Sequence, residues 1–466
     1  MKNMNNFTKG PILPSLITFA LPVLLSIFLQ TMYGAVDMMI VGWFGTDADV
    51  TAVSTGSWIM HALTTVIVGL SMGTTIFIGI KIGEGKSKET GNIIGAGIVL
   101  FSIVSLIMLL ITEIFAEQIA ILMQSPAEAF DDTVLYIRIC GAGFFFITAY
   151  NVLGAIFRGI GNSSMPLITV AIACVFNIVG DLIFVGSLGM GVAGAAIATV
   201  LAQLFSVVIS LIIIKKTGLP FSFGLGNIRF DKKLIGRTFS LGFPIAFQEF
   251  LVSISFLAIT AIINNLGQTM GVAVTAGVGV AEKVCGFIML VPSAYMQAMS
   301  AFVSQNIGAH EFKRARKALF CGILTSVAIG AVMFAFTFFR GDLLAGIFAK
   351  DKPEAIYYAA EYLKAYAIDC IFVSFLFCFI GYFNGYGKTR FVMWQGLVGA
   401  FCVRIPVSLI MSTIEPVSVL RIGLATPCST VVQITMCFIC FALLIRREKK
   451  LTYSDTLNEP KTNLIV

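Results

Sequence analysis

The sequence predicts an all-α polytopic membrane protein whose twelve transmembrane helices form two six-helix bundles related by a pseudo-two-fold axis. Composition is the first reason, because 58% of the 466 residues are hydrophobic and only 12% are charged. An ordinary soluble domain is about one quarter charged. Long apolar runs also recur along the whole chain, which excludes a secreted protein with a single signal peptide. In addition, the two halves of the chain repeat each other.

Twelve runs are long enough to cross about 30 Å of hydrocarbon at about 1.5 Å per helical residue. They cover approximately residues 14–43, 51–82, 91–115, 133–157, 164–187, 190–214, 235–266, 272–304, 317–339, 355–383, 391–413 and 421–445. The polar connection that contains Gly and Pro near the middle of the chain is typical of a linker. We therefore expect an N-terminal bundle over 1–214, a cytoplasmic linker over 215–233, a C-terminal bundle over 234–446 and a poorly ordered cytoplasmic tail over 447–466.

The two halves align without gaps over one long stretch. It pairs LITFALPVLLSIFLQTMYGAVDMMIVGWFG with TFSLGFPIAFQEFLVSISFLAITAIINNLG, so Pro22 matches Pro244 and Gly45 matches Gly267. Two shorter matches follow in the same order, YIRICGAGF with YLKAYAIDC and FRGIG with FNGYG. Because each half has an even number of spans, the copies share one topology and an axis along the membrane normal, as in secondary transporters with parallel repeats.

The basic residues predict the orientation of the chain. If both termini lie on one side, 23 Lys and Arg fall in the segments of that side. The opposite loops hold only Arg340, Lys350, Lys352 and Arg421. The positive-inside rule then places both termini in the cytoplasm, and we expect a multi-pass protein of the inner (cytoplasmic) membrane. The net charge of +7 belongs to helix ends beside the lipid bilayer, so no nucleic-acid partner is expected.

The first span carries the first candidate site. Its only charged residue is Asp37, and a carboxylate in mid-membrane costs about 3 kcal/mol on insertion scales, so such residues usually face a protein interior or a wet cavity. Tyr33 lies four residues earlier and therefore on the same helix face. Pro22 removes a backbone donor and is expected to kink the helix or loosen its first third. The alternative is that Asp37 is a structural acid and Pro22 a tolerated membrane proline.

A second acid lies in the fifth span, where Asn177 and Asp181 are four residues apart and share one face. Thr199 adds a hydroxyl in the sixth span, whose many Gly and Ala residues permit close helix packing. These oxygen-rich groups suit a proton or a hard cation such as Na⁺. The ten cysteines are scattered without metal-type spacing, so neither a metal site nor a cofactor is expected. GEGKSKET lacks the spacing of a phosphate loop, and no nucleophile or HExxH constellation indicates an enzyme.

Several short motifs together resemble the multidrug and toxic compound extrusion (MATE) family. They are the early Pro with a downstream Asp in the first span, RGIGNSSMP, NxxxD in the fifth span, GMGVAGAAIAT and SQNIGA. The resemblance implies two six-helix bundles around a V-shaped cavity and export of drugs or organic cations, and hence antibiotic resistance, against H⁺ or Na⁺ entry. It maps Tyr33, Asp37, Asn177, Asp181 and Thr199 onto the family's N-lobe cation site. It places Pro22, Gln30 and Tyr136 near the drug-binding cavity.

The seventh span departs from part of this pattern. Glu249 matches a C-lobe acid used in one branch of the family, but the position of its partner acid is occupied by Val373. Asp369 lies one helical turn before Val373, so the resemblance does not assign the role of the C-lobe partner acid to Asp369. Glu249 is then expected to attract cations in the substrate cavity, with a structural hydrogen bond across helices as the alternative.

We therefore expect an antiporter, coupled to H⁺ or Na⁺, that exports amphipathic cations as a monomer by alternating access. A lipid-linked oligosaccharide flippase of the same wider superfamily is the main alternative. Its cavity would hold several central Arg or Lys residues to bind lipid phosphates, whereas acids occupy mid-span here. An ion channel is a further alternative, but a repeat with one acid cluster in one lobe favours alternating access.

Overall fold

The computed structural model describes residues 6–219, 221–349 and 352–456, and within these ranges the chain is helical without strands. The N-terminal half comprises α1 (Ile12–Phe44), α2 (Asp47–Gly83), α3 (Thr90–Ile114), α4 (Ala116–Leu122), α5 (Phe130–Ala142), α6 (Phe144–Gly159), α7 (Ser164–Asp181) and α8 (Gly191–Thr217). The C-terminal half comprises α9 (Lys232–Met270), α10 (Val272–Ile288), α11 (Leu290–Gly308), α12 (Phe312–Phe348), α13 (Pro353–Gly385), α14 (Thr389–Leu397), α15 (Ile405–Thr413), α16 (Val419–Gly423) and α17 (Ala425–Thr456). Two π-helical segments, Leu182–Ser187 and Val398–Arg404, extend α7 and join α14 to α15.

The predicted all-α fold with twelve spans is confirmed. In the described ranges, eleven helices or helix pairs are long and apolar enough to cross a membrane, and the pair α5–α6, bent by 55°, makes a twelfth. The chain end differs from the prediction, because α17 continues as a helix to Thr456, past the expected end of the bundle at residue 446. The rest of the predicted tail, 457–466, lies outside the described residues.

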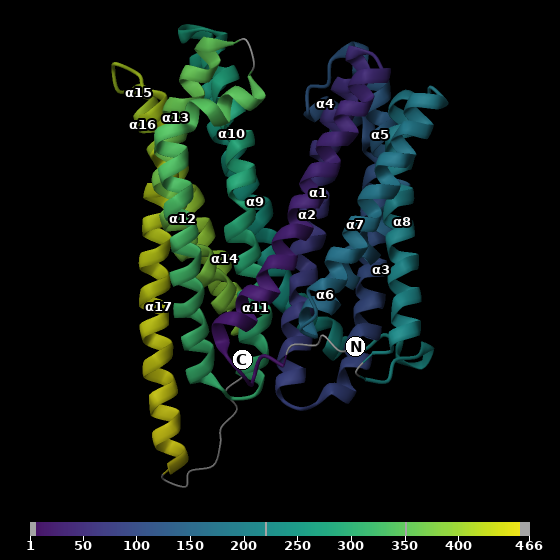
Figure 1. Ribbon diagram of the computed structural model, residues 1–466, viewed down its shortest axis with the longest axis vertical. Helices are drawn as coiled ribbons and strands as arrows, with labels where there is room; N and C mark the ends of the chain where they lie inside the picture. Colours follow the sequence, from purple (N-terminus) through teal and green to yellow (C-terminus); the bar gives the residue numbers. More distant parts are fainter. Residues whose placement is uncertain (1–5, 220, 350–351, 457–466) are drawn as a thin grey trace.

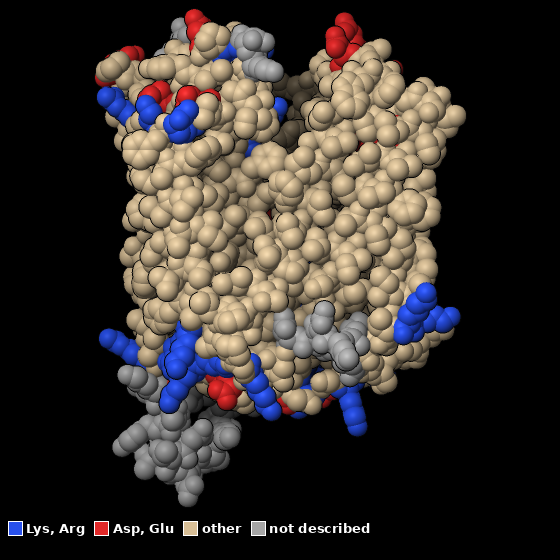
Figure 2. All heavy atoms as spheres, viewed as in Figure 1, with Lys and Arg blue, Asp and Glu red and all other residues tan. Residues whose placement is uncertain are grey.

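The helices form two bundles that stand side by side, α1 to α8 and α9 to α17 (Figure 1). We call the end where α1 begins and α17 ends the lower face, and the end that carries α4 and α15 the upper face. The molecule is hollowed between the bundles at the upper face, and Lys and Arg side chains line the lower rim (Figure 2). The hollow is open at the upper face.

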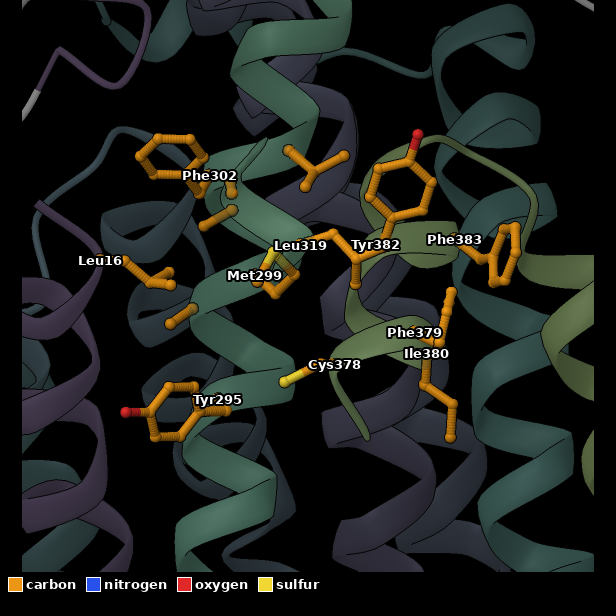
Figure 3. Close-up of a cluster of buried hydrophobic side chains, with 14 of the residues drawn as sticks. Leu16, Tyr295, Met299, Phe302, Leu319, Cys378, Phe379, Ile380, Tyr382 and Phe383 are labelled. Carbon is orange, nitrogen blue, oxygen red and sulfur yellow. The ribbon is translucent and has the colours of Figure 1, made fainter. Parts of the chain in front are cut away.

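The long helices α1 and α9 each pack against both bundles. Near its start α1 buries Leu16 and Phe19 among residues of α11, α12 and α13 (Figure 3), whereas near its end Ile40 and Val41 are buried with residues of α2, α5 and α8. In the same way, the start of α9 packs with α2, α3 and α6, and its end packs with α10 and α13. This matching exchange is what the repeated sequence predicts. It joins the two bundles near the lower face.

Small residues allow α2 to lie very close to the C-terminal bundle. A Cβ on Gly73 would come within 2.6 Å of the Gly242 nitrogen in α9, a distance that real Cβ atoms do not show. Further down, a Cβ on Gly83 would overlap the carbonyl oxygen of Gln305 in α11. Backbone contact of this kind leaves no space between the bundles, so it closes the cleft towards the lower face.

Candidate functional site

The two predicted acids meet inside the N-terminal bundle. Asp37 comes from the upper half of α1 and Asp181 from the last residue of α7, and their side chains are 4% and 0% exposed. The two acids are close enough to interact electrostatically, and two buried like charges repel each other. A proton or a cation bound between them would remove this repulsion.

The other predicted members surround this pair. Asn177 donates from Nδ2 to the Thr199 hydroxyl at 3.4 Å, which links α7 to α8. The Tyr33 hydroxyl lies near Asp37 but accepts a hydrogen bond from Gln203 Nε2 at 3.3 Å. Gln203 was not predicted, although it lies one turn after Thr199 on α8 and is 6% exposed. The four-residue spacing of the hydroxyl and the amide was the signal that could have revealed it.

Several unpaired acceptor atoms lie at this cluster. Within the described residues, Asp37 Oδ1, both Asp181 carboxylate oxygens, Asn177 Oδ1 and Gln203 Oε1 are buried without a hydrogen-bond donor. Buried polar atoms are almost always hydrogen-bonded, so such a group of unsatisfied acceptors is unusual. All are oxygens, the ligand type that a proton, Na⁺ or another hard cation prefers. The α-helical pattern also gives way to a π-helix directly after Asp181, a distortion frequent at functional sites.

The predicted cavity residues lie at different places. Pro22 is half-buried inside α1, which continues as one helix from Ile12 to Phe44, and its carbonyl accepts a bond from the Ser26 hydroxyl. Gln30 donates to the Tyr150 hydroxyl at 2.8 Å and so connects α1 to α6. Glu249 is half-buried on α9.

Tyr136 lies in the interior of the N-terminal bundle. Its side chain is 3% exposed, its ring packs directly on Gly56 of α2, and its hydroxyl is 3.1 Å from that of Ser57. It is near enough to Asp37 for an electrostatic interaction. The structure therefore places Tyr136 beside the acid cluster.

The C-terminal bundle holds a different set of buried polar groups. Asp369 of α13 is 1% exposed and lies within electrostatic range of Arg404, which ends the second π-helical segment. Arg404 donates to the Ser255 hydroxyl at 3.1 Å, and its guanidinium carbon lies 4.4 Å from the centre of the Phe256 ring. The acid of this bundle thus already has a cationic neighbour in the protein.

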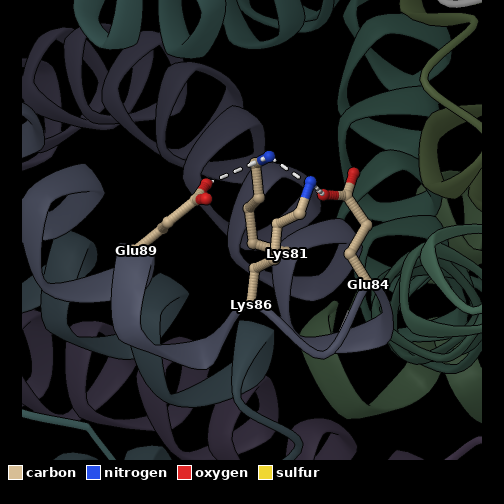
Figure 4. Close-up of polar contacts among 4 residues, drawn as sticks. All are labelled: Lys81, Glu84, Lys86 and Glu89. Carbon is tan, nitrogen blue, oxygen red and sulfur yellow. Dashed lines mark hydrogen bonds and ion pairs between the residues drawn. The ribbon is translucent and has the colours of Figure 1, made fainter.

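The segment that superficially resembles a phosphate loop forms ion pairs with itself at the lower face (Figure 4). Lys81 Nζ lies 2.9 Å from Glu84 Oε2 and 3.2 Å from Glu89 Oε2, and Lys86 lies 3.1 Å from Glu84. Partial burial tends to raise the pKa of the Glu84 carboxyl, but the two lysines outweigh burial and hold this pKa below its usual value. Lys86 is therefore paired within the segment, and Lys81 pairs with it from the last turn of α2.

Two repeated bundles around a cleft that is open at one face define the architecture of a secondary transporter with parallel repeats. The family model MatE matches residues 22–183 and again residues 244–410. The chain belongs to this family, as the sequence motifs predict.

Curated relatives and solved structures agree with this assignment. The chain is 25% identical over 442 residues to "Probable multidrug resistance protein YoeA" of Bacillus subtilis, covering 92% of this chain and 94% of that protein. It is 23% identical to "Multidrug export protein MepA" of Staphylococcus saprophyticus, covering 84% and 86%. The fold matches "Outward-facing conformation of a multidrug resistance MATE family transporter of the MOP superfamily" with a TM-score of 0.89, 18% identity and coverage of 96% and 98%.

Proposed function

We propose that this protein is an antiporter, coupled to H⁺ or Na⁺, that exports drugs and organic cations by alternating access. The observation that carries the proposal is the buried cluster of unpaired oxygen acceptors around Asp37 and Asp181 in one bundle. The names of the relatives, a multidrug resistance protein and a multidrug export protein, support the substrate class. In this proposal the protein acts as a monomer, is no enzyme and needs no cofactor.

The coupling ion would bind between Asp37 and Asp181 from the side of the open cleft. Neutralising the pair removes the repulsion between two buried like charges, so α1 and α7 can approach more closely. Asn177, Thr199 and Gln203 then exchange hydrogen-bond partners around the pair. Because α1 packs in both bundles, a shift of its upper half is transmitted to the interface that closes the lower face.

The substrates of the proposed antiporter are amphipathic monovalent cations. Glu249 supplies a negative charge on α9, and apolar and aromatic side chains dominate the membrane part of the chain. A low dielectric strengthens the attraction of a cation to such an acid, while aromatic faces and flexible Met side chains accept varied shapes. If cells export only anions or lipid-linked sugars through the protein, the flippase alternative replaces this proposal.

We expect both termini to be cytoplasmic, with the cleft open to the outside of the inner membrane. The 23 basic residues on the termini side and the basic lower rim in Figure 2 support this orientation. Reporter fusions at Thr46, Gly189 and Gly267 should be located outside. Fusions after Lys86, Asn227 and Lys313 should be located inside. A cytoplasmic signal at Gly189 would contradict the arrangement of six spans in each half.

Ion coupling is tested with purified protein in proteoliposomes. A fluorescent lipophilic cation is loaded inside, and sodium and proton gradients are imposed separately. We expect one of the two gradients to drive movement of the dye, and the dye gradient to drive movement of that ion in return. Dye movement that is equal with and without either gradient would reject antiport.

A further inference from the structure

The short segment before α1 inserts the side chain of Phe7 into the C-terminal bundle. Phe7 is 0% exposed, and its ring centre lies 5.1 Å from that of Phe19 in α1 and 5.0 Å from that of Phe302 in α11. The segment is a turn in which the Lys9 nitrogen bonds to the Asn6 carbonyl. A non-helical segment with a completely buried aromatic side chain is held in a defined place.

One arginine of the C-terminal bundle binds the backbone of this segment through all three of its nitrogens. Arg314 of α12 donates from Nε to the Phe7 carbonyl at 2.7 Å, from Nη1 to Gly10 at 2.7 Å and from Nη2 to Lys9 at 2.9 Å. Asn306 Nδ2 adds a bond to the Phe7 carbonyl at 3.2 Å. The rigid fork of a guanidinium can satisfy three carbonyls at once, which an ammonium on a flexible chain cannot reproduce.

Gln305 joins this segment to the other bundle. Its Oε1 accepts from the Phe7 nitrogen at 3.4 Å, and its Nε2 donates to the carbonyl of Gly159, the last residue of α6, at 3.1 Å. The side chain is 1% exposed. The same turn of α11 lies against Gly83 of α2 at the lower face. A single amide therefore connects the N-terminal segment, the C-terminal bundle and the N-terminal bundle at the closed end of the cleft.

We propose that residues 6–10 are a latch that keeps the lower face closed, with Arg314 and Gln305 as its receptor. The start of α1 is fixed to the C-terminal bundle by the latch, while the end of α1 lies in the N-terminal bundle. Separating the bundles at the lower face must therefore release the latch or pull α1 apart, and it breaks the bond from Gln305 to Gly159. This assigns a role to Gln305 and Asn306 of SQNIGA, and it relies on the alternating access proposed above.

The latch is tested by measuring distances at both faces in the full-length protein in detergent and in nanodiscs. Spin labels at Lys88 and Lys313 report the lower face, and labels at Leu188 and Val272 report the upper face, in a background whose reactive cysteines are replaced by serine. Arg314→Ala should raise the ratio of molecules with an open lower face by about tenfold. In those molecules the lower distance lengthens and the upper distance shortens. Fraying of the segment alone would leave the upper distance unchanged and would contradict the latch.

A matched control is Arg316→Ala. Arg316 lies two residues from Arg314 but pairs with Glu448 of α17 at 2.8 Å, within the same bundle, so both distances should stay as in the parent. Phe7→Ala changes a residue outside the helices and removes the ring that packs on Phe19 and Phe302. It decides the question if Arg314→Ala does not fold. Phe7→Ala should lengthen the lower distance and shorten the upper distance, as expected for Arg314→Ala. Unchanged distances would overturn the proposal. These distances need neither an ion gradient nor a substrate, so a failure of ion-coupled export leaves their interpretation intact.

Discussion

Asp37→Asn should abolish gradient-driven export while leaving the protein folded. Asparagine nearly keeps the shape of the side chain but cannot exchange a proton or supply a charge to Na⁺, so the pair with Asp181 no longer cycles between two charge states. Removing one of two adjacent acids leaves no buried cation unpaired, and stability should stay within about 1 kcal/mol of the parent. Efflux of a fluorescent cation by reconstituted protein measures the first effect, and thermal unfolding in detergent measures the second.

Two further variants distinguish a loss of ion coupling from a general loss of folded protein. Asp181→Asn should behave like Asp37→Asn, because each removes one member of the same pair. Asp342→Asn makes the same chemical change at a side chain that is 57% exposed, and transport should remain at the parent level. Binding of the fluorescent cation should persist in Asp37→Asn. Full export by this variant would remove the Asp37 carboxyl from the mechanism.

The fold could be predicted from the sequence because its main determinants are local. Run length fixes the spans, and the matching prolines and glycines of the two halves indicate the repeat. What sequence reasoning missed depends on packing. The extension of α17 to Thr456 runs through a charged stretch, where no apolar pattern marks a helix. Near Pro22, the buried residues of α1 pack on the C-terminal bundle, a tertiary contact that the local sequence does not show.

Part of the acid cluster could also be predicted, because local sequence spacing determines it. Asn177 and Asp181 are four residues apart, which places them on one helix face. An acid within an apolar span also indicates a functional site. Their contact with Asp37 joins α7 to α1, and only the resemblance to a known family brought these helices together. Gln203 lay four residues from Thr199 and could have been found. The partner of Gln30, Tyr150, lies 120 residues away and could not.

The proximity of Asp369 and Arg404 in the C-terminal bundle was also hidden, because the two residues lie on different elements. Both side chains are almost fully buried. This arrangement explains why the N-terminal bundle is the better candidate for coupling. Among the described residues, no cationic side chain acts on the two acids there, whereas Arg404 lies within electrostatic range of Asp369.

Asp369→Asn should therefore act in the opposite way to Asp37→Asn, by lowering stability rather than coupling. The substitution removes a negative charge within electrostatic range of the buried Arg404 guanidinium. Because no direct ion pair joins these two described residues, we expect a loss of about 1 kcal/mol. The double variant Asp369→Asn/Arg404→Met removes both charges and should recover most of that loss, which thermal unfolding of the four proteins in one cycle measures. The folded fraction of Asp369→Asn should still export the fluorescent cation under a gradient. If Asp369→Asn is as stable as the parent, the two charges do not stabilise each other. If Asp369→Asn loses ion coupling at normal stability, the C-terminal bundle contains a second coupling site.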